Sequence, residues 1–367
     1  MRTFPLISII TVNYNGLDLT IELLNSIRKL SYPSLEIFVV DNASKVSPQS
    51  HLQAFFPEVK CIRSDKNLGF AGGNNLAARQ AKGDFIFFIN NDAEITEGCL
   101  EKLVVLFEKR PKLGIVSPLI CYFNESKGAS ADLIQYAGMT QMNALTARNS
   151  TIGEKIRDSK QFADAMPTAY AHGAAMMISK KAMNKVGLMF EDFFLYYEEL
   201  DWCERIKRAG FEIYVEPRAR IYHKESATVG AMSTLKTHYI NRNRIYFMRR
   251  NYGGLSFVAF VFFLTFIAIP KNILGFVLRG QFDHVKAFAK AVFWNVKDWL
   301  SKIYKRNPTI KQELAIWASL LIILTKKVTI QAWYALFFAT LKRRAPRKSI
   351  GAKLFFEVKI VDFCFKK

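Results

Sequence analysis

Short apolar runs alternate with segments of helical periodicity over the first ninety residues. The runs have the apolarity of strands buried on both faces of a parallel sheet, and they occupy residues 6–12, 35–40, 59–63 and 83–90. Between the first two runs, Leu19, Leu23, Ile27 and Leu30 recur at helical spacing and predict a helix over 17–30. This alternation predicts a doubly wound α/β domain with a mostly parallel sheet.

Polar side chains follow several of these strands at the point where each ends. Asn13 and Asn15 follow the first strand and Asp41 follows the second, while the fourth ends in Asn90-Asn91-Asp92. Open α/β sheets bind ligands at this carboxyl edge. Carboxylate and amide oxygens suit Mg²⁺ or Mn²⁺, which usually arrive with a phosphorylated substrate. The alternative is a turn that caps a following helix over 98–109.

A glycine-rich loop, Asn67–Asn75, follows the third strand. Its glycines have the spacing G-x-x-G-G, whereas a dinucleotide-binding fingerprint needs G-x-G-x-x-G after the first strand. No phosphate loop of the form G-x-x-x-x-G-K-[ST] is present in the sequence. We therefore reject both of those nucleotide folds. The glycines either approach a ligand or allow a helix to lie close to the sheet.

A second segment with candidate chemistry lies at 195–210, where apolar spacing predicts a helix that ends at Gly210. Glu198, Glu199 and Asp201 crowd its first turn, where the helix dipole stabilises anions. Asp201 can pair with Arg205 on a solvated face, as i,i+4 ion pairs do. That explanation leaves Glu198 and Glu199 unassigned, and a carboxylate at a helix start beside a cleft suits a general base.

Two histidines accompany these segments. His172 lies in a predicted returning strand over 169–179 and is interpreted as a core residue. His223 follows two short predicted strands around Pro217, and a metal, a phosphate or a structural role stays open for it. Residues 127–160 are polar and are predicted to form a loop-like insertion, which either faces an acceptor substrate or is a mobile lid.

The charge of the chain is very unevenly distributed. Residues 1–234 hold 27 Lys and Arg against 26 Asp and Glu, whereas residues 235–367 hold 25 against 5. Half of the chain is hydrophobic, which excludes global disorder. The five scattered cysteines fit a reducing compartment, and the short N-terminal apolar run is interpreted as a strand and not as a signal peptide.

The basic C-terminal third also carries apolar runs. Residues 255–269 contain no charge, Pro270-Lys271 interrupts them, and 273–278 resumes the apolarity. Shorter apolar runs follow at 314–324 and 332–340, flanked by lysines and arginines. This pattern predicts helices that lie in an anionic membrane interface. A nucleic-acid surface is the weaker alternative, because such surfaces need exposed cations and not long apolar segments.

Seven motifs in order resemble bacterial family 2 glycosyltransferases, with the closest likeness to the rhamnosyltransferase-like branch. They are VNYNG (12–16), VVDNAS (39–44), NLGFAGGNN (67–75), FINNDAEI (88–95), AHGAAMMIS (171–179), FFLYYEELDWCERIKRAG (193–210) and IYHKESAT (221–228). The resemblance covers about residues 5–250. It implies a GT-A type nucleotide-diphospho-sugar transferase fold as the catalytic domain 1–250, followed by a membrane-associated helical region, 251–367.

The resemblance also implies roles for individual residues. The predicted nucleotide-sugar contacts are Val12, Asn13, Asn15, Asp41, Asn67, Gly69, Gly73, Asn74, Asn90 and Asn91. Asp92, together with His223, is predicted to bind Mg²⁺ or Mn²⁺, and Glu199, with Glu198, supplies the catalytic base. The chain departs from the family where Glu199 replaces the usual Asp and where Asn90 replaces the first Asp of an Asp-x-Asp motif.

The activity implied is inverting transfer of a sugar, with dTDP-L-rhamnose as the preferred donor, to a lipid-linked glycan acceptor. Such an enzyme would work in cell-envelope polysaccharide synthesis at the cytoplasmic face of the bacterial inner membrane. A UDP-sugar donor and a non-catalytic nucleotide-sugar-binding membrane partner are the alternatives, and no nucleic-acid partner is expected.

Overall fold

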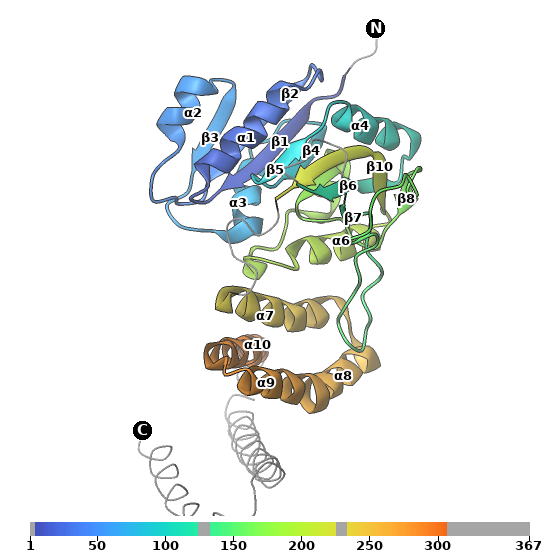
Figure 1. Cartoon of the computed structure of the whole chain (residues 1–367). Coiled ribbons are helices and arrows are strands. Elements are labelled where there is room, and N and C mark those ends of the chain that lie inside the picture. The colour runs from blue at the N-terminus through green and yellow to red at the C-terminus, as the bar shows by residue number, and fades with distance from the viewer. Residues whose placement is uncertain (1–3, 124–132, 225–232, 307–367) are drawn as a thin grey trace, which may run out of the picture. The chain divides into compact units, whose positions relative to one another are not determined.

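The computed structural model describes residues 4–123, 133–224 and 233–306 (Figure 1). The strands are β1 (Ile7–Asn13), β2 (Leu35–Asp41), β3 (Val59–Arg63), β4 (Phe85–Ile89), β5 (Ala93–Ile95), β6 (Leu113–Tyr122), β7 (Ile134–Tyr136), β8 (Met166–Pro167), β9 (Ala175–Ser179) and β10 (Glu212–His223). The α-helices are α1 (Leu17–Arg28), α2 (Gln49–Phe55), α3 (Gly69–Ala78), α4 (Cys99–Lys109), α5 (Lys180–Val186), α6 (Glu198–Arg208), α7 (Thr234–Asn251), α8 (Gly254–Phe263), α9 (Ile269–Leu278) and α10 (Phe282–Arg306).

The strands form one mixed sheet in the order β3-β2-β1-β4-β9-β6-β10-β5. The first four positions are parallel, as predicted, and β9 joins the other half by pairing antiparallel with both β4 and β6. The register places Asn13 beside Asp41 at the ends of β1 and β2. It also pairs His223 with Ala93, the residue after Asp92. Polar residues far apart in the sequence therefore meet at one edge.

Two apolar cores cover the two faces of the sheet. In β1, Ile7 and Ile9 point into one core, whereas Ile10 points into the other, because successive side chains of a strand alternate between faces. Helices α1 and α4 cover the first face, while α3, α6 and α7 contribute to the second. Burial on both faces explains the near-continuous apolarity of the predicted strands.

Several predicted elements differ from the structure. The two short strands predicted around Pro217 are one strand, β10, whose register against β6 shifts between Glu216 and Arg220. This irregularity accommodates a proline, which has no N–H to donate to the ladder. Part of the polar insertion at 127–160 forms β7, which pairs with β6, and residues 127–132 lie outside the described residues.

Helices α7 and α8 pack into the second core of the sheet. Phe247 of α7 and Phe260 of α8 are fully buried in the second core. Pro270 interrupts the apolar run in the sequence, but it does not end the helix, because a π-helical turn over Leu264–Ala268 joins α8 to α9. Such a turn absorbs the hydrogen bond that a proline removes.

The first compact unit runs from Met1 to Val296, and the second begins at Lys297. The boundary at residue 250 stays a prediction, and the structure adds that α7 and α8 belong to the first unit. The predicted apolar helices at 314–324 and 332–340 lie outside the described residues.

Candidate functional site

Asn13 links the turns that follow β1 and β2 at the carboxyl edge of the sheet. It is buried at the end of β1, and both ends of its side-chain amide are used. Its Nδ2 donates to Ser44 Oγ (3.1 Å), while Oδ1 accepts from Gly16 N (3.2 Å) and Thr20 Oγ1 (3.1 Å). The side chain therefore holds the turn between β1 and α1 against the turn after β2.

Asp41, which the sequence placed at the nucleotide, is fully buried and paired. Its Oδ1 accepts from Ser44 N (3.0 Å), and its Oδ2 forms an ion pair with Arg63. Asn15 has left-handed backbone with φ 55°, and its N–H donates to Ser44 Oγ (2.9 Å). These contacts fix the loops that would enclose a base and ribose.

The Asn67–Asn75 loop is held by a second set of amides. Asn42 Nδ2 donates to Asn67 Oδ1 (3.0 Å), which also accepts from Gly69 N (2.8 Å). Gly69 has φ +70°, and a Cβ there would lie 2.0 Å from the carbonyl oxygen of Phe194. Only glycine fits at this position, because backbone from the segment before α6 approaches it closely.

The remaining predicted residues of this loop pack α3 against the sheet. A Cβ on Gly73 would lie 3.1 Å from the side chain of Val12, which is half-buried at the end of β1. Asn74 is buried, and its Nδ2 donates to Phe70 O (3.0 Å). The close-packing explanation therefore accounts for Gly73, and a nucleotide contact by these residues stays a prediction.

The three polar residues that follow β4 point in two different directions. Asn91 Nδ2 donates back to α1, to Gly16 O (3.2 Å) and Thr20 Oγ1 (3.1 Å). Asn90 and Asp92 instead face His223. Asn90 Nδ2 lies 3.3 Å from His223 Nε2, and Asp92 Oδ1 lies 3.1 Å from the same atom. The two predicted metal ligands are thus brought together.

Gln135 of β7 sets the tautomer of His223. Its Oε1, which carries only lone pairs, lies 2.8 Å from Nδ1 of the buried imidazole. The hydrogen is therefore on Nδ1, and Nε2 presents its lone pair toward Asn90 and Asp92. Asp92 Oδ1 is buried without a hydrogen-bond donor. Sequence reasoning missed Gln135, because nothing marks a glutamine in a polar insertion as the partner of a distant histidine.

The spacing of Asp92 and His223 fits a divalent ion. Octahedral Mg²⁺ binds at about 2.1 Å, which places adjacent ligands about 3 Å apart. The 3.1 Å between Asp92 Oδ1 and His223 Nε2 matches that separation. Within the described residues, no group of three or more His, Cys, Asp or Glu side chains could hold a metal, so further ligands would come from substrate phosphates and water.

The segment His172–Ala174 links the metal-side residues to the acidic helix. Asn90 N donates to Ala174 O (2.9 Å), and the ring of His172 lies 6.4 Å from that of His223. A Cβ on Gly173 would lie 3.9 Å from Glu199 Cδ. His172 Nδ1 accepts from Ala174 N (3.0 Å), and burial lowers the pKa of His172 to about 3. His172 is therefore a neutral side chain with its own backbone partner.

Glu198 and Glu199 are the first two residues of α6. Each has an Oε2 atom that is buried without a hydrogen-bond partner. Burial raises the pKa of Glu199 to about 7. Burial, and then the neighbouring charge of Glu199, raise the pKa of Glu198 well above its usual range. Of the two, Glu199 therefore exchanges its proton near neutral pH.

Asp201, in the same turn, has a structural role. The predicted pair with Arg205 is present, with Nε 3.1 Å from Oδ2, but the carboxylate is fully buried and not on a solvated face. Its Oδ1 accepts from Arg250 Nε and Asn251 Nδ2, both at 2.9 Å, at the end of α7. The three acidic residues of this turn are thus divided into one that is paired and two that are not.

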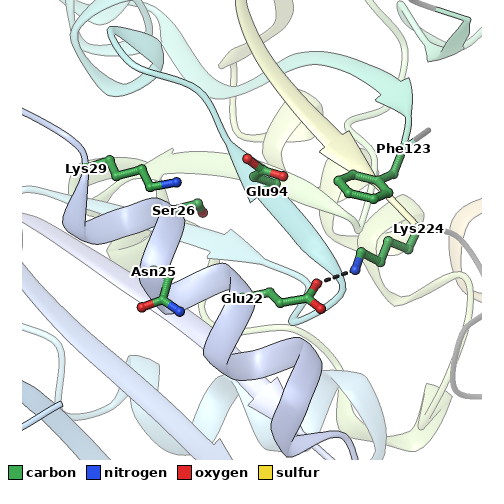
Figure 2. Close-up of a pocket in the computed structure, with 7 residues that line it drawn as sticks. All are labelled: Glu22, Asn25, Ser26, Lys29, Glu94, Phe123 and Lys224. Atoms are coloured by element: carbon green, nitrogen blue, oxygen red, sulfur yellow. Dashed lines mark hydrogen bonds and ion pairs between the residues drawn. The ribbon is translucent and has the colours of Figure 1, made fainter. Parts of the chain in front are cut away.

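A separate pocket of about 430 Å³ lies between α1, β5 and the residues that follow β6 and β10 (Figure 2). It is lined by Glu22, Asn25, Ser26, Lys29, Glu94, Phe123 and Lys224. Lys224 forms an ion pair with Glu22, and its Nζ lies 4.6 Å from the ring centroid of Phe123. None of the residues predicted for the site lines this pocket.

The chain is similar to known glycosyltransferases in sequence and in fold. A sequence model of the family described as Glycosyl transferase family 2 matches residues 8–187. The low-salt glycan biosynthesis hexosyltransferase Agl10 of Haloferax volcanii is 28% identical over 216 residues, which cover 56% of this chain and 63% of that protein. The chain thus spans less than two thirds of that relative.

Two further similarities concern sequence and fold. The N-acetylglucosaminyl-diphospho-decaprenol L-rhamnosyltransferase of Mycobacterium tuberculosis is 23% identical over 212 residues, covering 53% of this chain and 68% of that protein. The crystal structure of GalNAc-T7 with UDP, GalNAc and Mn²⁺ is similar in fold, with a TM-score of 0.50 at 17% identity. That match covers 65% of this chain and 48% of the other.

Proposed function

The chain belongs to glycosyltransferase family 2 and has the GT-A fold expected from its sequence, and we propose from this premise that it is an inverting sugar transferase. The donor is a nucleotide-diphospho-sugar, and dTDP-L-rhamnose is the first choice because of the resemblance to the rhamnosyltransferase branch. The mycobacterial relative, named for rhamnosyl transfer to a diphospho-decaprenol carrier, supports a lipid-linked acceptor.

The observation that carries the proposal is the pair of glutamates at the start of α6, in which Glu198 is buried and Glu199 is half-buried with a buried Oε2. A base is most effective when its pKa lies near the working pH, and burial raises the pKa of Glu199 to about 7. Its unpartnered Oε2 is available to accept a proton. A purely structural carboxylate would be paired, as Asp201 is.

In the proposed reaction, the Glu199 carboxylate takes the proton of an acceptor hydroxyl. The hydroxyl oxygen forms a bond to the anomeric carbon from the face opposite the leaving group. The bond between that carbon and the phosphate oxygen breaks, and the nucleoside diphosphate departs. Glu199 then releases its proton to solvent. One carboxylate suffices, since the leaving group needs no protonation, unlike the glycosidic oxygen that a hydrolase must protonate.

Asp92 and His223 would hold Mg²⁺ or Mn²⁺ beside the diphosphate. When bound, such an ion neutralises the negative charge that develops on the departing nucleotide. The residues of the chain prepare this position. Gln135 keeps the hydrogen of His223 on Nδ1, so that Nε2 and Asp92 Oδ1, which has no competing donor, would both be available to an ion.

Transfer by the purified full-length protein tests this function. The assay would offer dTDP-rhamnose and UDP-sugars with a lipid-linked acceptor, with Mg²⁺ or Mn²⁺ and with a chelator. We expect ion-dependent release of nucleoside diphosphate together with a glycosylated acceptor. Donor binding without product would instead identify a non-catalytic nucleotide-sugar-binding partner, and no binding of any donor would contradict the proposal.

We further propose that the exposed face of α8 and α9 contacts an anionic membrane surface. Among the described residues, Gly254–Leu278 is the one helix long and apolar enough to cross a membrane, with a mean hydropathy of 2.1. One stripe of it is buried against the protein, including Phe260 and Leu264. Phe262 and Phe266 lie on the other side, more than half exposed. This division favours a helix that lies in the interface.

Substitution of the exposed face separates membrane contact from folding. We expect Phe262→Gln with Phe266→Gln to reduce sedimentation with vesicles that contain anionic lipid, because both rings are exposed. Lys271 and Arg279 lie in or next to the same helix, so binding should also weaken as salt increases. A double variant that sediments like the wild type would contradict the membrane contact and, with it, the proposed cytoplasmic-face location.

A further inference from the structure

The backbone that leads into Glu198 is strained. Phe194, Tyr196 and Tyr197 all have positive φ, at 64°, 71° and 74°, although none is glycine. At Phe194, ψ is −57° and Leu195 N donates to Phe193 O (2.7 Å), which is a γ-turn of the rare, strained hand. Bulky residues avoid such backbone unless their surroundings impose it. The neighbours of this segment should therefore reveal what imposes it.

Asn243 of α7 contacts three carbonyl oxygens of this segment. Its Nδ2 lies 2.8 Å from Phe193 O, 2.7 Å from Leu195 O and 2.8 Å from Tyr196 O. The side chain is fully buried. Two amide hydrogens thus serve three carbonyls that flank the γ-turn. No other described side chain bonds more than two carbonyls of residues 193–197, so Asn243 is the principal link between α7 and the turn.

Arg242 orients that amide. Its Nε donates to Asn243 Oδ1 (2.7 Å), which directs the Nδ2 group of Asn243 toward the carbonyls. A terminal nitrogen of Arg242 also donates to Phe193 O (2.6 Å). The guanidinium is itself held between the rings of Tyr239 and Trp294, at 4.6 Å and 4.5 Å from their centroids. Rings from α7 and α10 therefore fix the orientation of the Arg242 guanidinium and, through it, of the Asn243 amide.

The Phe194–Tyr197 turn also contacts the Asn67–Asn75 loop. Phe194 O accepts from Phe70 N (2.6 Å), and Gly69 is the residue that allows this close approach. At its other end, α7 binds α6 through Asp201, which accepts from Arg250 and Asn251. Helix α7 thus holds both sides of the α6 N-terminus, at the turn before Glu198 and at Asp201 after Glu199. Figure 1 shows α7 next to α6, between it and α8–α10.

We propose that Asn243 is a positioning residue for catalysis, which holds the strained Phe194–Tyr197 turn so that Glu198 and Glu199 face the acceptor side of the site. This inference rests on the proposed function. It lies outside residues 8–187, the region that the family model matches, and it makes α7 a working part of the site. Loss of the three hydrogen bonds lets the turn relax toward ordinary backbone and shifts the start of α6.

Asn243→Leu removes the donors at nearly constant volume, and Asn241→Leu is its matched control. Asn241 lies on the same helix, but its Nδ2 donates only to Thr237 O within that helix (2.8 Å). We expect Asn243→Leu to lower the turnover number about 10- to 100-fold, as displacements near 1 Å do, while the dissociation constant of the nucleotide-sugar donor changes less than threefold. Asn241→Leu should resemble the wild type in both.

Two readouts distinguish positioning from a general loss of structure. The pH at which turnover falls to half on the acid side of its profile should shift in Asn243→Leu, because the surroundings of the Glu199 carboxyl change. Hydrogen exchange should increase at residues 194–199 and stay unchanged in β1 and β4. If Asn243→Leu does not fold, Asn243→His, which keeps one donor, is measured in the same way and should show an intermediate loss of turnover.

The outcomes separate this inference from the proposed function. Wild-type turnover and wild-type exchange at 194–199 in Asn243→Leu would overturn the positioning role. Equal losses in donor affinity and turnover would overturn it as well, since a positioning residue acts on the chemical step. If the wild type transfers no sugar, the proposed function fails, and faster exchange at 194–199 then supports only the hold of Asn243 on the turn.

Discussion

The two sides of the sheet edge treat their polar groups in opposite ways. On the donor side, Asn13 and Asp41 are buried and every polar atom of their side chains has a partner. On the catalytic side, Asp92, Glu198 and Glu199 each keep one buried oxygen without a hydrogen-bond donor. Unpartnered buried carboxylates cost stability, whereas satisfied amides are nearly neutral. The side that we propose for the donor is thus held by satisfied hydrogen bonds, and the side that we propose for catalysis keeps carboxylates that are available to react.

This difference indicates where substitutions should affect chemistry and where they should affect folding. Strain and unpartnered charge persist in native proteins where function requires them. The strained turn before Glu198 adjoins these acids. We therefore expect substitutions on the catalytic side to lower turnover without destabilising the fold, and substitutions on the donor side to do the reverse.

The largest effect is expected from removing the base. Glu199→Gln should lower turnover by about 10²–10⁴, because the acceptor hydroxyl loses its proton acceptor. Donor affinity should stay within about threefold, and Glu198→Gln, the matched neighbour, should lose less. If Glu199→Gln retained wild-type turnover and Glu198→Gln lost it, the base would be Glu198.

The next effect concerns the residue behind the metal position. Gln135→Leu removes the acceptor that keeps the hydrogen of His223 on Nδ1. The ion concentration needed for half-maximal activity should therefore rise about 10- to 100-fold, as it does when other hydrogen-bond partners of metal ligands are removed. Titration of activity with Mn²⁺ measures this. Gln141→Leu is the control, because the exposed Gln141 donates to Tyr170 and Glu204 and does not contact His223. An unchanged Mn²⁺ requirement in Gln135→Leu would contradict the proposed ligand role of His223.

A smaller and graded effect is expected from pH. Burial raises the pKa of Glu199 to about 7, so turnover should rise with pH, about tenfold per unit below that value, and level off above it. Of the groups around Glu199, the tyrosine, cysteine and arginine side chains do not titrate between pH 5 and 8, whereas Glu198, whose pKa is also raised, contributes to the profile. Burial raises the pKa values of Tyr197 and Cys203 to about 12, the pKa of Tyr196 is also raised, and Arg242 and Arg244 stay protonated. Burial keeps Glu198 protonated beyond its usual range. A profile that is flat from pH 5 to 8 would exclude Glu199 as the base.

The smallest effect tests the donor side. Asn13→Ala leaves Thr20 and Ser44 without their buried partner and should lower the free energy of unfolding by about 1–3 kcal/mol. Denaturant unfolding of Asn13→Ala and of the exposed control Asn25→Ala measures the difference. Full stability in Asn13→Ala would remove the contrast between the two sides.

Periodicity and strand-end chemistry predicted much of this molecule from the sequence. The four N-terminal strands and α1 follow from apolar runs and helical spacing, and Asp92 and His223 meet as the family resemblance implied. Local rules failed at Pro217, where a register shift absorbs the proline, and they did not decide whether a helix continues through Pro270, where a π-helical turn absorbs the proline. In both cases tertiary packing overrides the local preference.

Other features depend on contacts that no local pattern encodes. Gln135 and Asn243 act on residues 88 and 47–50 positions away, and ordinary polar residues in an insertion and in a basic helix give no signal of this. The left-handed backbone at Phe194 and Tyr197 contradicts the preference of bulky residues. Such positions are where sequence reasoning is expected to fail, because function and not local propensity decides them.

The paired change in stability and turnover of Glu199→Gln at pH 8 tests the central claim most directly. A raised pKa means that the native protein keeps the proton of Glu199 while the unfolded chain releases it. Glu199 therefore lowers the free energy of unfolding by an amount that grows as pH rises from about 4.5 to about 7 and stays constant above that. We predict that Glu199→Gln increases the free energy of unfolding at pH 8 by about 1–3 kcal/mol, with no gain at pH 4, while turnover falls. A variant that is less stable than the wild type at pH 8, or that turns over normally, would contradict the account.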